Sequence, residues 1–315
     1  MMVATPTFGV SQVGCRDRDR QSRSVMVKRF WYGLSCCLLC VWLPVRAELC
    51  SIRYFQQDAR YAYRTALLRL VLDKTQELGA CRLSPQFTTV TQDRGLALMQ
   101  EGRIDVVSMP TTLQRERDLR AVRFDVLRGL LGYRVLLIRK QQQADFAAVQ
   151  SLAELRHFRM GFGMHWADLP LLQYNGFRVV AAPHYESLFA MLARGRFDGF
   201  PRGLNEAWQE LGEQKAAFPD LMVEPTLAFH YPWPVYFFVR KDNQALAERL
   251  QLGLQRAQAD GSLRQLFMQH HGQLLQQAQL AQRRLFLLSN PSLPPGTPQA
   301  DTSWWLPATQ KLSGH

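Results

Sequence analysis

Three side chains that can donate hydrogen bonds to an anion lie near the start of the stretch Ser108–Lys140. Ser108, Thr112 and Arg115 follow an apolar run, Ile104–Val107, that predicts a buried strand. A planar guanidinium matches a carboxylate with two parallel hydrogen bonds, and hydroxyl groups can supply further donors. The pattern predicts an anion site, although a solvated basic loop has the same composition.

A second group follows the predicted strand Arg159–Gly163. Gly163, His165 and Trp166 stand where a helix is expected to begin, and the free backbone N–H groups of a helix start attract anions. Gly163 would allow a ligand to approach closely, His165 would donate a hydrogen bond and Trp166 would stack on the ligand. The alternative is a place in the core, which is the more common role of an aromatic residue at a helix start.

Further candidates flank other predicted strands. Arg202 follows the strand Phe197–Phe200, and Tyr54 and Tyr61 flank the end of the first strand, Cys50–Gln56. Polar residues at the ends of strands are where α/β folds place ligands. For the tyrosines, a packing role is an equal alternative.

Strands and helices alternate along the chain. Around the strands Cys50–Gln56, Cys81–Phe87 and Ile104–Val107, apolar periodicity predicts helices at Tyr61–Leu78 and Gln92–Gln100, which is typical of a parallel α/β sheet. After the strand Tyr133–Ile138 the pattern restarts with further strands and helices, which are Arg159–Gly163, Trp166–Asn175, Arg178–Ala182, Glu186–Arg194 and Phe197–Phe200. An amphipathic helix is expected at Asn243–Ala259.

The order Thr112, Arg115, Glu116 and Phe124, followed by a strand that ends in Arg139 and Lys140, resembles a pattern of the periplasmic solute-binding proteins of family 3. The stretch from Val239 to Gly272 is similar to the same family. The resemblance implies a type II periplasmic binding fold, with two α/β lobes, each a mainly parallel sheet flanked by helices, joined by two hinge strands. It also implies that Arg115 holds a ligand carboxylate. The family's amino-acid binders often carry an aspartate near Arg202, so an arginine there favours an anionic or acceptor-rich ligand.

With this fold, residues 48–131 and 230–288 would form lobe 1, residues 132–229 lobe 2, and residues 289–315 a proline-rich tail that Trp304 and Trp305 pin to the surface. The two passages between lobes are expected near Leu130–Gly132 and Leu227–Tyr231. Domain interfaces are favoured ligand sites, so the ligand is expected between the lobes.

The N-terminus predicts export. Residues 26–47 have the basic, apolar and small-residue order of a signal peptide, and residues 1–25 are interpreted as a leader or a mis-assigned start. The alternative is an uncleaved anchor. Cleavage after Ala47 removes seven Lys or Arg and two Asp, which lowers the net charge from +12 to +7. The remaining arginines are scattered, so we expect no nucleic-acid partner.

The cleaved chain keeps two of its six cysteines, Cys50 and Cys81, each at the start of a predicted strand. If these strands are parallel neighbours, an oxidising periplasm allows a disulfide between them, and two buried free thiols are the alternative. No spacing typical of metal ligands remains, so we expect neither a metal nor a cofactor.

The sequence favours a monomeric periplasmic protein that binds a small polar or anionic molecule and hands it to an inner-membrane permease. We expect it not to be an enzyme. The alternatives are a dehydratase-like periplasmic enzyme, for which Asp168, His165 and Glu186 would be the proton-transfer groups, and an extracytoplasmic sensory module.

Overall fold

The computed structural model describes residues 50–87, 90–299 and 302–303. The predicted leader and signal peptide, and the expectation for Trp304 and Trp305, lie outside these residues. Within the described ranges, no helix combines the length and hydropathy that crossing a membrane requires.

The first two strands form a parallel pair, as predicted. β1 (Cys50–Tyr54) pairs with β2 (Cys81–Pro85), and the helix α1 (Ala62–Asp73) connects them. Apolar side chains recur along one face of α1 at helical spacing and are buried, which fixes that face against the core. The helix is shorter than the predicted Tyr61–Leu78, since its last turns are replaced by a 3-10 helix at Gln76–Leu78.

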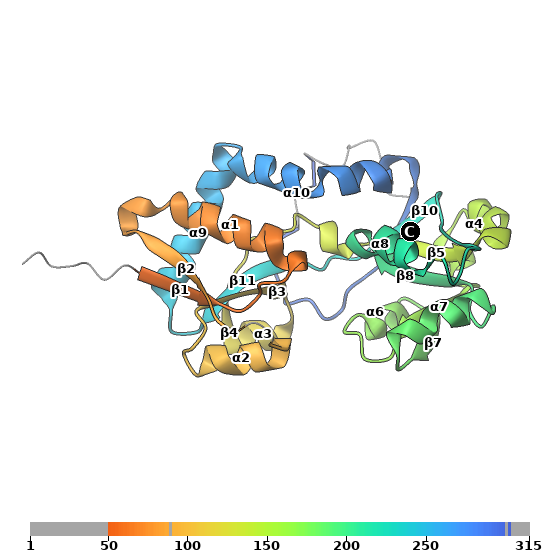
Figure 1. Ribbon diagram of the computed structural model, residues 1–315, viewed down its shortest axis with the longest axis horizontal. Coiled ribbons are helices and arrows are strands. Elements are labelled where there is room, and N and C mark those ends of the chain that lie inside the picture. The colour runs from red at the N-terminus through yellow and green to blue at the C-terminus, as the bar shows by residue number, and fades with distance from the viewer. Residues whose placement is uncertain (1–49, 88–89, 300–301, 304–315) are drawn as a thin grey trace, which may run out of the picture. The chain divides into compact units, whose positions relative to one another are not determined.

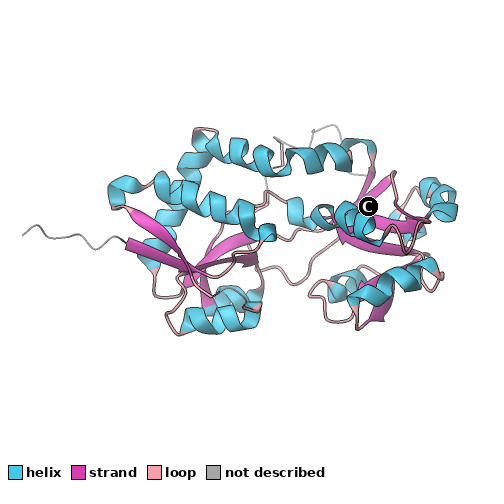
Figure 2. Ribbon diagram, in the orientation of Figure 1, coloured by secondary structure: helices cyan, strands magenta, loops and turns pink. Residues whose placement is uncertain are grey.

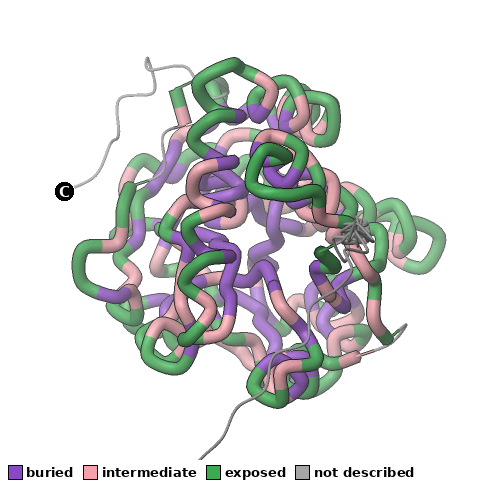
Figure 3. Tube along the Cα trace, turned by 90° about the vertical axis from the view of Figure 1, so that its left-hand side faces the viewer, coloured by how far each residue is buried: buried purple, intermediate pink, exposed green. Residues whose placement is uncertain are grey.

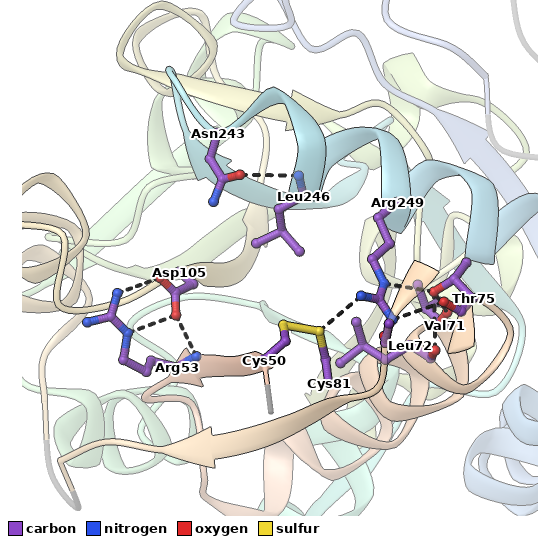
Figure 4. Close-up of a disulfide and its surroundings, with 11 residues drawn as sticks. Cys50, Arg53, Val71, Leu72, Thr75, Cys81, Asp105, Asn243, Leu246 and Arg249 are labelled. Atoms are coloured by element: carbon purple, nitrogen blue, oxygen red, sulfur yellow. Dashed lines mark hydrogen bonds and ion pairs between the residues drawn. A yellow bond between two sulfur atoms is a disulfide. The ribbon is translucent and has the colours of Figure 1, made fainter. Parts of the chain in front are cut away.

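The register of β1 and β2 sets Cys50 directly opposite Cys81, and a disulfide joins their sulfur atoms. Figure 4 shows the bond beside the guanidinium of Arg249, whose Nη1 donates to Sγ of Cys81 at 3.0 Å. Arg249 also donates to the side chain and the carbonyl of Thr75, each at 3.0 Å. The segment that carries β1, α1 and β2 is thereby connected to the helix α9 (Gln244–Ala259), far away in sequence.

Replacing both Cys50 and Cys81 by serine is expected to lower the free energy of unfolding by about 3 kcal/mol. The disulfide spans a sequence separation of 31 residues, and its loss frees a loop of that length in the unfolded chain. Urea unfolding of the oxidised protein and of the double serine variant measures the difference. Two alkylatable thiols in the unreduced, unfolded protein would contradict the pairing.

Three further strands form an antiparallel sheet. β11 (Val235–Arg240) lies between β3 (Val106–Pro110) and β4 (Leu119–Val122). The helices α2 (Gln92–Gln100) and α3 (Leu113–Asp118) precede and follow β3. We expected the third strand in one parallel sheet with β1 and β2, whereas its ladder runs antiparallel to β11.

Side chains still connect β1 to β3. Arg53 donates from its backbone N–H and from its guanidinium to Asp105, just before β3. Gln56 donates to the carbonyl of Ser108 and accepts from its N–H, both at 2.7 Å. The amide of Gln56 thus takes the place of a backbone ladder.

The second half of the chain builds a mixed seven-stranded sheet. Its order is β12 (Arg284–Leu287), β10 (Leu227–His230), β5 (Tyr133–Arg139), β8 (Gly199–Gly203), β6 (Arg159–Gly163) and β7 (Arg178–Ala182), and β9 (Leu221–Val223) pairs with β5. β6 is parallel to β7 and β8, whereas β5 is antiparallel to β8 and β10.

The strands form two groups, one of β1–β4 with β11 and the other the seven-stranded sheet, and helices flank both groups (Figures 1 and 2). In Figure 1, α1, α9 and α10 lie above the strands β1, β2, β3 and β11, and α2 and α3 lie below them. The remaining helices are α4 (Gln143–Ala148), α5 (Leu152–Leu155), α6 (Leu169–Tyr174), α7 (Tyr185–Ala193), α8 (Leu204–Gln214) and α10 (Ser262–Ala278). The helix α10 contacts α1 and α9 and reaches α8. Buried residues gather inside and exposed ones outside, as Figure 3 shows.

Three chain segments pass between the two groups of strands, where we expected two. Residues 123–132 include the predicted passage Leu130–Gly132. The second passage is residues 231–234 and not the predicted Leu227–Tyr231, because Leu227–His230 is strand β10. The two passages touch, since Tyr231 N–H donates to the carbonyl of Gly132. A Cβ on Gly132 would lie 2.1 Å from the carbonyl oxygen of Tyr231, so the contact requires glycine. The third passage, residues 279–283, leads from α10 to β12. β12 pairs with β10, which corrects the prediction that lobe 1 extends to residue 288.

Candidate functional site

A cavity of 770 Å³ opens between segments from both halves of the chain. This volume lies within the range of small-molecule sites. Its walls come from the β1–α1 connection, the passage before β5, the end of β8, α8 and α10. The lining residues with polar side chains are Asp58, Arg60, Tyr63, Arg64, Tyr185, Arg202, Asn205, Glu206, Gln209, Glu210, Glu213, His270 and His271.

Arg64 is the cationic group best placed to hold a ligand in this cavity. It lies on α1 three and four residues before the buried Leu67 and Leu68, so it shares the apolar face of the helix. Its Nη1 donates to the carbonyl of Ser108 at 3.4 Å, and its guanidinium lies 5.0 Å from the ring centre of Tyr61. Burial lowers the pKa of Arg64. Among the described residues, no carboxylate pairs with it.

Arg60, which also lines the cavity near the start of α1, differs from Arg64 in its exposure and in having a carboxylate partner. It pairs with Asp58 at 2.8 Å, and its side chain is 75% exposed. Exposed ion pairs of this kind contribute little to stability. The charge of Arg60 at the rim is therefore balanced by Asp58, whereas Arg64 has no carboxylate partner among the described residues.

Tyr54, Tyr61 and Ser108, which were proposed from the sequence for the ligand site, lie together beside Arg64. They line a small space of about 10 Å³, which is at the lower limit for a single water molecule. The hydroxyl of Ser108 donates to Oε1 of Gln56 at 3.1 Å. These residues pack beside Arg64, and the space that they line together is too small for a solute.

Thr112 and Arg115 line neither of these cavities. The hydroxyl of Thr112 accepts from the backbone N–H of Arg115 and caps the helix α3, which the sequence analysis did not predict. Nη1 of Arg115 donates to the carbonyl of Pro110 at 2.6 Å, and burial lowers the pKa of its guanidinium. The carboxylate-binding role expected for Arg115 stays a prediction, and in this structure Arg64 faces the cavity instead.

Arg202 lines the cavity, but its Nε and Nη2 are already engaged. Nε and Nη2 donate to the two carboxylate oxygens of Glu210 at 2.6 and 2.5 Å, and Nη2 lies 3.0 Å from Glu206. Burial lowers the pKa of Arg202. The hydrogen bonds to Glu210 and the negative charge of Glu206 raise it by more, so the pKa lies above the ordinary value of an arginine. The charge of Arg202 is therefore already compensated by two carboxylates, which disfavours a further anionic partner there.

Gly163, His165 and Trp166 do not line the cavity. A Cβ on Gly163 would lie 2.4 Å from the indole of Trp166, so glycine is needed to let this ring fold over the end of β6. The indole stacks on Phe200 at 6.0 Å and meets Phe162 edge-on at 4.8 Å. Trp166 therefore packs against the core, which was the alternative left open, and His165 is exposed.

The groups proposed for an enzyme do not converge. Asp168 is buried and accepts from Nη2 of Arg134 at 2.9 Å and from the hydroxyl of Tyr231 at 2.5 Å. Glu186 and His165 are exposed. Asp168 thus connects α6 to β5 and to the passage after β10, and no described proton shuttle lies beside it.

His271, in the wall formed by α10, makes stability depend on pH. Burial, and then the charges of His270 and Arg64, lower its pKa to about 4. Between the pKa of the folded state and that of the unfolded state, ~6.5, the folded state binds fewer protons. The contribution of His271 to stability is therefore fully present above pH ~6.5 and is lost as the pH falls towards 4. The free energy of unfolding should fall between about pH 7 and pH 5, and we expect this fall to be smaller in His271→Gln by up to about 2 kcal/mol.

Urea unfolding at both pH values measures this difference. Asp125, whose pKa burial raises to about 6, and His230, whose pKa burial lowers to about 4, contribute equally to the protein and to the variant. An unchanged pH dependence in His271→Gln would contradict the assignment.

Arg64 and the glutamates of α8 were not predicted from the sequence. A usable signal was present for both. Arg64 is a charged residue in register with the apolar stripe of α1, and Glu206 and Glu210 follow Arg202 at intervals of four residues.

A family model described as bacterial extracellular solute-binding proteins, family 3, matches residues 66–273. No curated protein matches the sequence. Among solved structures, the probable amino-acid ABC transporter extracellular-binding protein ytmK from Bacillus subtilis shares 13% identity, with a TM-score of 0.51, over 71% of this chain and 98% of that one. A double mutant of the Bordetella pertussis BvgS VFT2 domain shares 18%, with a TM-score of 0.50, over 70% and 92%.

The amino acid ABC transporter substrate-binding protein AbpA from Streptococcus pneumoniae, bound to L-arginine, shares 19% identity, with a TM-score of 0.44, over 67% of this chain and 84% of that one. At these identities the likeness to solved structures concerns the fold alone. The predicted two-lobed type II periplasmic binding fold is confirmed.

Proposed function

Because the chain belongs to the bacterial extracellular solute-binding proteins of family 3, we propose that it binds a small polar solute with an anionic group in the 770 Å³ cavity. The anionic group pairs with Arg64. The remainder of the solute lies between α1 and α8.

The unpaired state of Arg64 carries this proposal. A guanidinium removed from water loses hydration, and this loss is compensated when a carboxylate or phosphate pairs with it. Among the described residues, Arg64 has only the carbonyl of Ser108 as a hydrogen-bond partner. A bound anion would complete its donors.

The opposite wall favours a solute that also donates hydrogen bonds. α8 presents Asn205, Glu206, Gln209 and Glu213 to the cavity. Carboxylate and amide oxygens accept hydrogen bonds, so the proposed solute has hydroxyl or amino groups at the end away from Arg64. A solute that contacts both walls binds best when they are close, and this difference in affinity drives closure.

We also propose that the protein only binds its solute and delivers it to an inner-membrane permease from the periplasm. The pairing of Asp168 with Arg134 and Tyr231 supports a binding role without catalysis. The ABC transporter assignment of ytmK supports delivery by analogy of fold only. Loss of solute uptake in cells lacking the protein, with uptake restored by the protein and not by an Arg64→Ala variant, is the expected result.

A thermal-shift screen of residues 48–315 against small metabolites tests the binding function. We expect stabilisation by molecules that carry a carboxylate or phosphate together with hydroxyl or amino groups, because a ligand that binds only the folded state raises the unfolding midpoint. Matched esters and amides, which lack the negative charge, serve as controls. Equal stabilisation by the charged and the neutral member of each pair would contradict the anionic anchor.

A further inference from the structure

Arg202 is enclosed by a shell of acidic and aromatic side chains. Its guanidinium carbon lies 4.6 Å from the ring centre of Trp166, 5.1 Å from Phe200 and 5.7 Å from Tyr185. Glu210 binds it with both carboxylate oxygens, and Glu206 adds a second carboxylate. The side chain of Arg202 is 9% exposed and that of Glu210 14%.

The chemistry of this shell is that of a receptor for a guanidinium. Aromatic rings attract a cation, and a carboxylate with two oxygens in the plane of the guanidinium matches its pair of donors. Two glutamates against one arginine leave the shell with an excess of negative charge. Burial and a hydrogen bond with Glu210 raise the pKa of the Tyr185 hydroxyl, which keeps the tyrosine neutral.

The shell also lies at the wall of a solute-sized space. Tyr185, Arg202, Glu206 and Glu210 all line the 770 Å³ cavity. If the side chain of Arg202 were shortened, a free cation could enter the shell from the cavity. Other ion pairs of the protein, such as Arg159 with Asp198 at 3.1 Å, lie outside this shell.

We propose that this shell is a cation-binding site that the chain fills with its own guanidinium, and that Arg202 thereby determines specificity. With Arg202 in place, the shell is filled and offers a guanidinium ion no vacant site. Without it, the wall binds guanidinium and alkylguanidinium ions. The proposal concerns the wall itself and does not depend on the identity of the natural solute.

The variant Arg202→Ala tests this with ethylguanidinium chloride at millimolar concentration. We expect its unfolding midpoint to lie below that of the unmodified protein and to rise by several degrees in ethylguanidinium, with saturation. Ethylurea, which has a similar shape but no charge, and sodium chloride should leave it unchanged. Calorimetric titration should give binding to the variant and none to the unmodified protein.

Arg159→Ala is the matched control, because it also removes an arginine from a carboxylate but outside the aromatic shell. The double variant Arg202→Ala with Glu210→Gln should lose the response. If Arg202→Ala does not fold alone, its refolded yield in ethylguanidinium and in ethylurea is compared. No excess recovery or stabilisation by ethylguanidinium, relative to Arg159→Ala, would show that Arg202 forms a structural ion pair only.

Discussion

Replacing Arg64 by alanine is expected to weaken solute binding by on the order of 30-fold or more, because the anionic group then remains without its buried partner. Arg64 is the guanidinium that lines the cavity, lies against Tyr61 and has no carboxylate partner among the described residues. Calorimetry with a solute found in the screen measures the change in affinity. Arg64→Lys should restore part of it, since the charge returns without the planar fork.

Arg69→Ala is the matched control. Arg69 belongs to the same helix, is exposed and does not line the cavity, so its removal should leave the affinity unchanged. Arg115→Ala separates the two candidate anchors. Near-normal affinity in Arg64→Ala together with a large loss in Arg115→Ala would overturn the assignment to Arg64 and support the residue that the sequence pattern favours.

Replacing Asp168 by alanine is expected to lower the free energy of unfolding by about 3 to 5 kcal/mol. The reason is that Arg134 stays buried, with its side chain 10% exposed, after its carboxylate partner is gone. The hydroxyl of Tyr231 loses its acceptor in the same step. Urea unfolding measures the loss.

The control for this prediction is Asp58→Ala, which removes the carboxylate of an exposed ion pair with Arg60 and should cost less than about 1 kcal/mol. A second variant replaces both Arg134 and Asp168 by apolar residues of similar size. It should recover much of the stability, because no uncompensated charge then remains buried. A similar small loss for Asp168→Ala and Asp58→Ala would contradict the structural role of Asp168.

Local sequence patterns predicted many helices and strands correctly. The predicted helix Gln92–Gln100 and the predicted strands Arg159–Gly163 and Arg178–Ala182 have the same bounds in the structure as α2, β6 and β7. Each has a strong local signal, such as the cap of α2, where Thr91 accepts from Arg94 N–H. Pairing between distant strands is not visible in this way. The antiparallel ladder of β3 with β11 and the position of β12 therefore became known only from the structure.

In the candidate site, too, local features were predictable from the sequence and tertiary contacts were not. Sequence reasoning selected residue types that bind anions, and Ser108, Tyr54 and Tyr61 do meet beside one arginine. Which arginine is free depends on its neighbours in space. Arg202 looked free because its partners Glu206 and Glu210 belong to the next helix, and Trp166 looked available because its stacking on Phe200 is a tertiary contact.

A crystal structure of residues 48–315 with the solute from the screen tests the central claim most directly. The account predicts that the solute lies in the cavity between α1 and α8, with its anionic group at hydrogen-bond distance, ~3 Å, from the guanidinium of Arg64. In that structure Arg202 should keep its pairing with Glu210. A solute bound by Arg115 or by the guanidinium of Arg202, with Arg64 facing only Ser108, would contradict it.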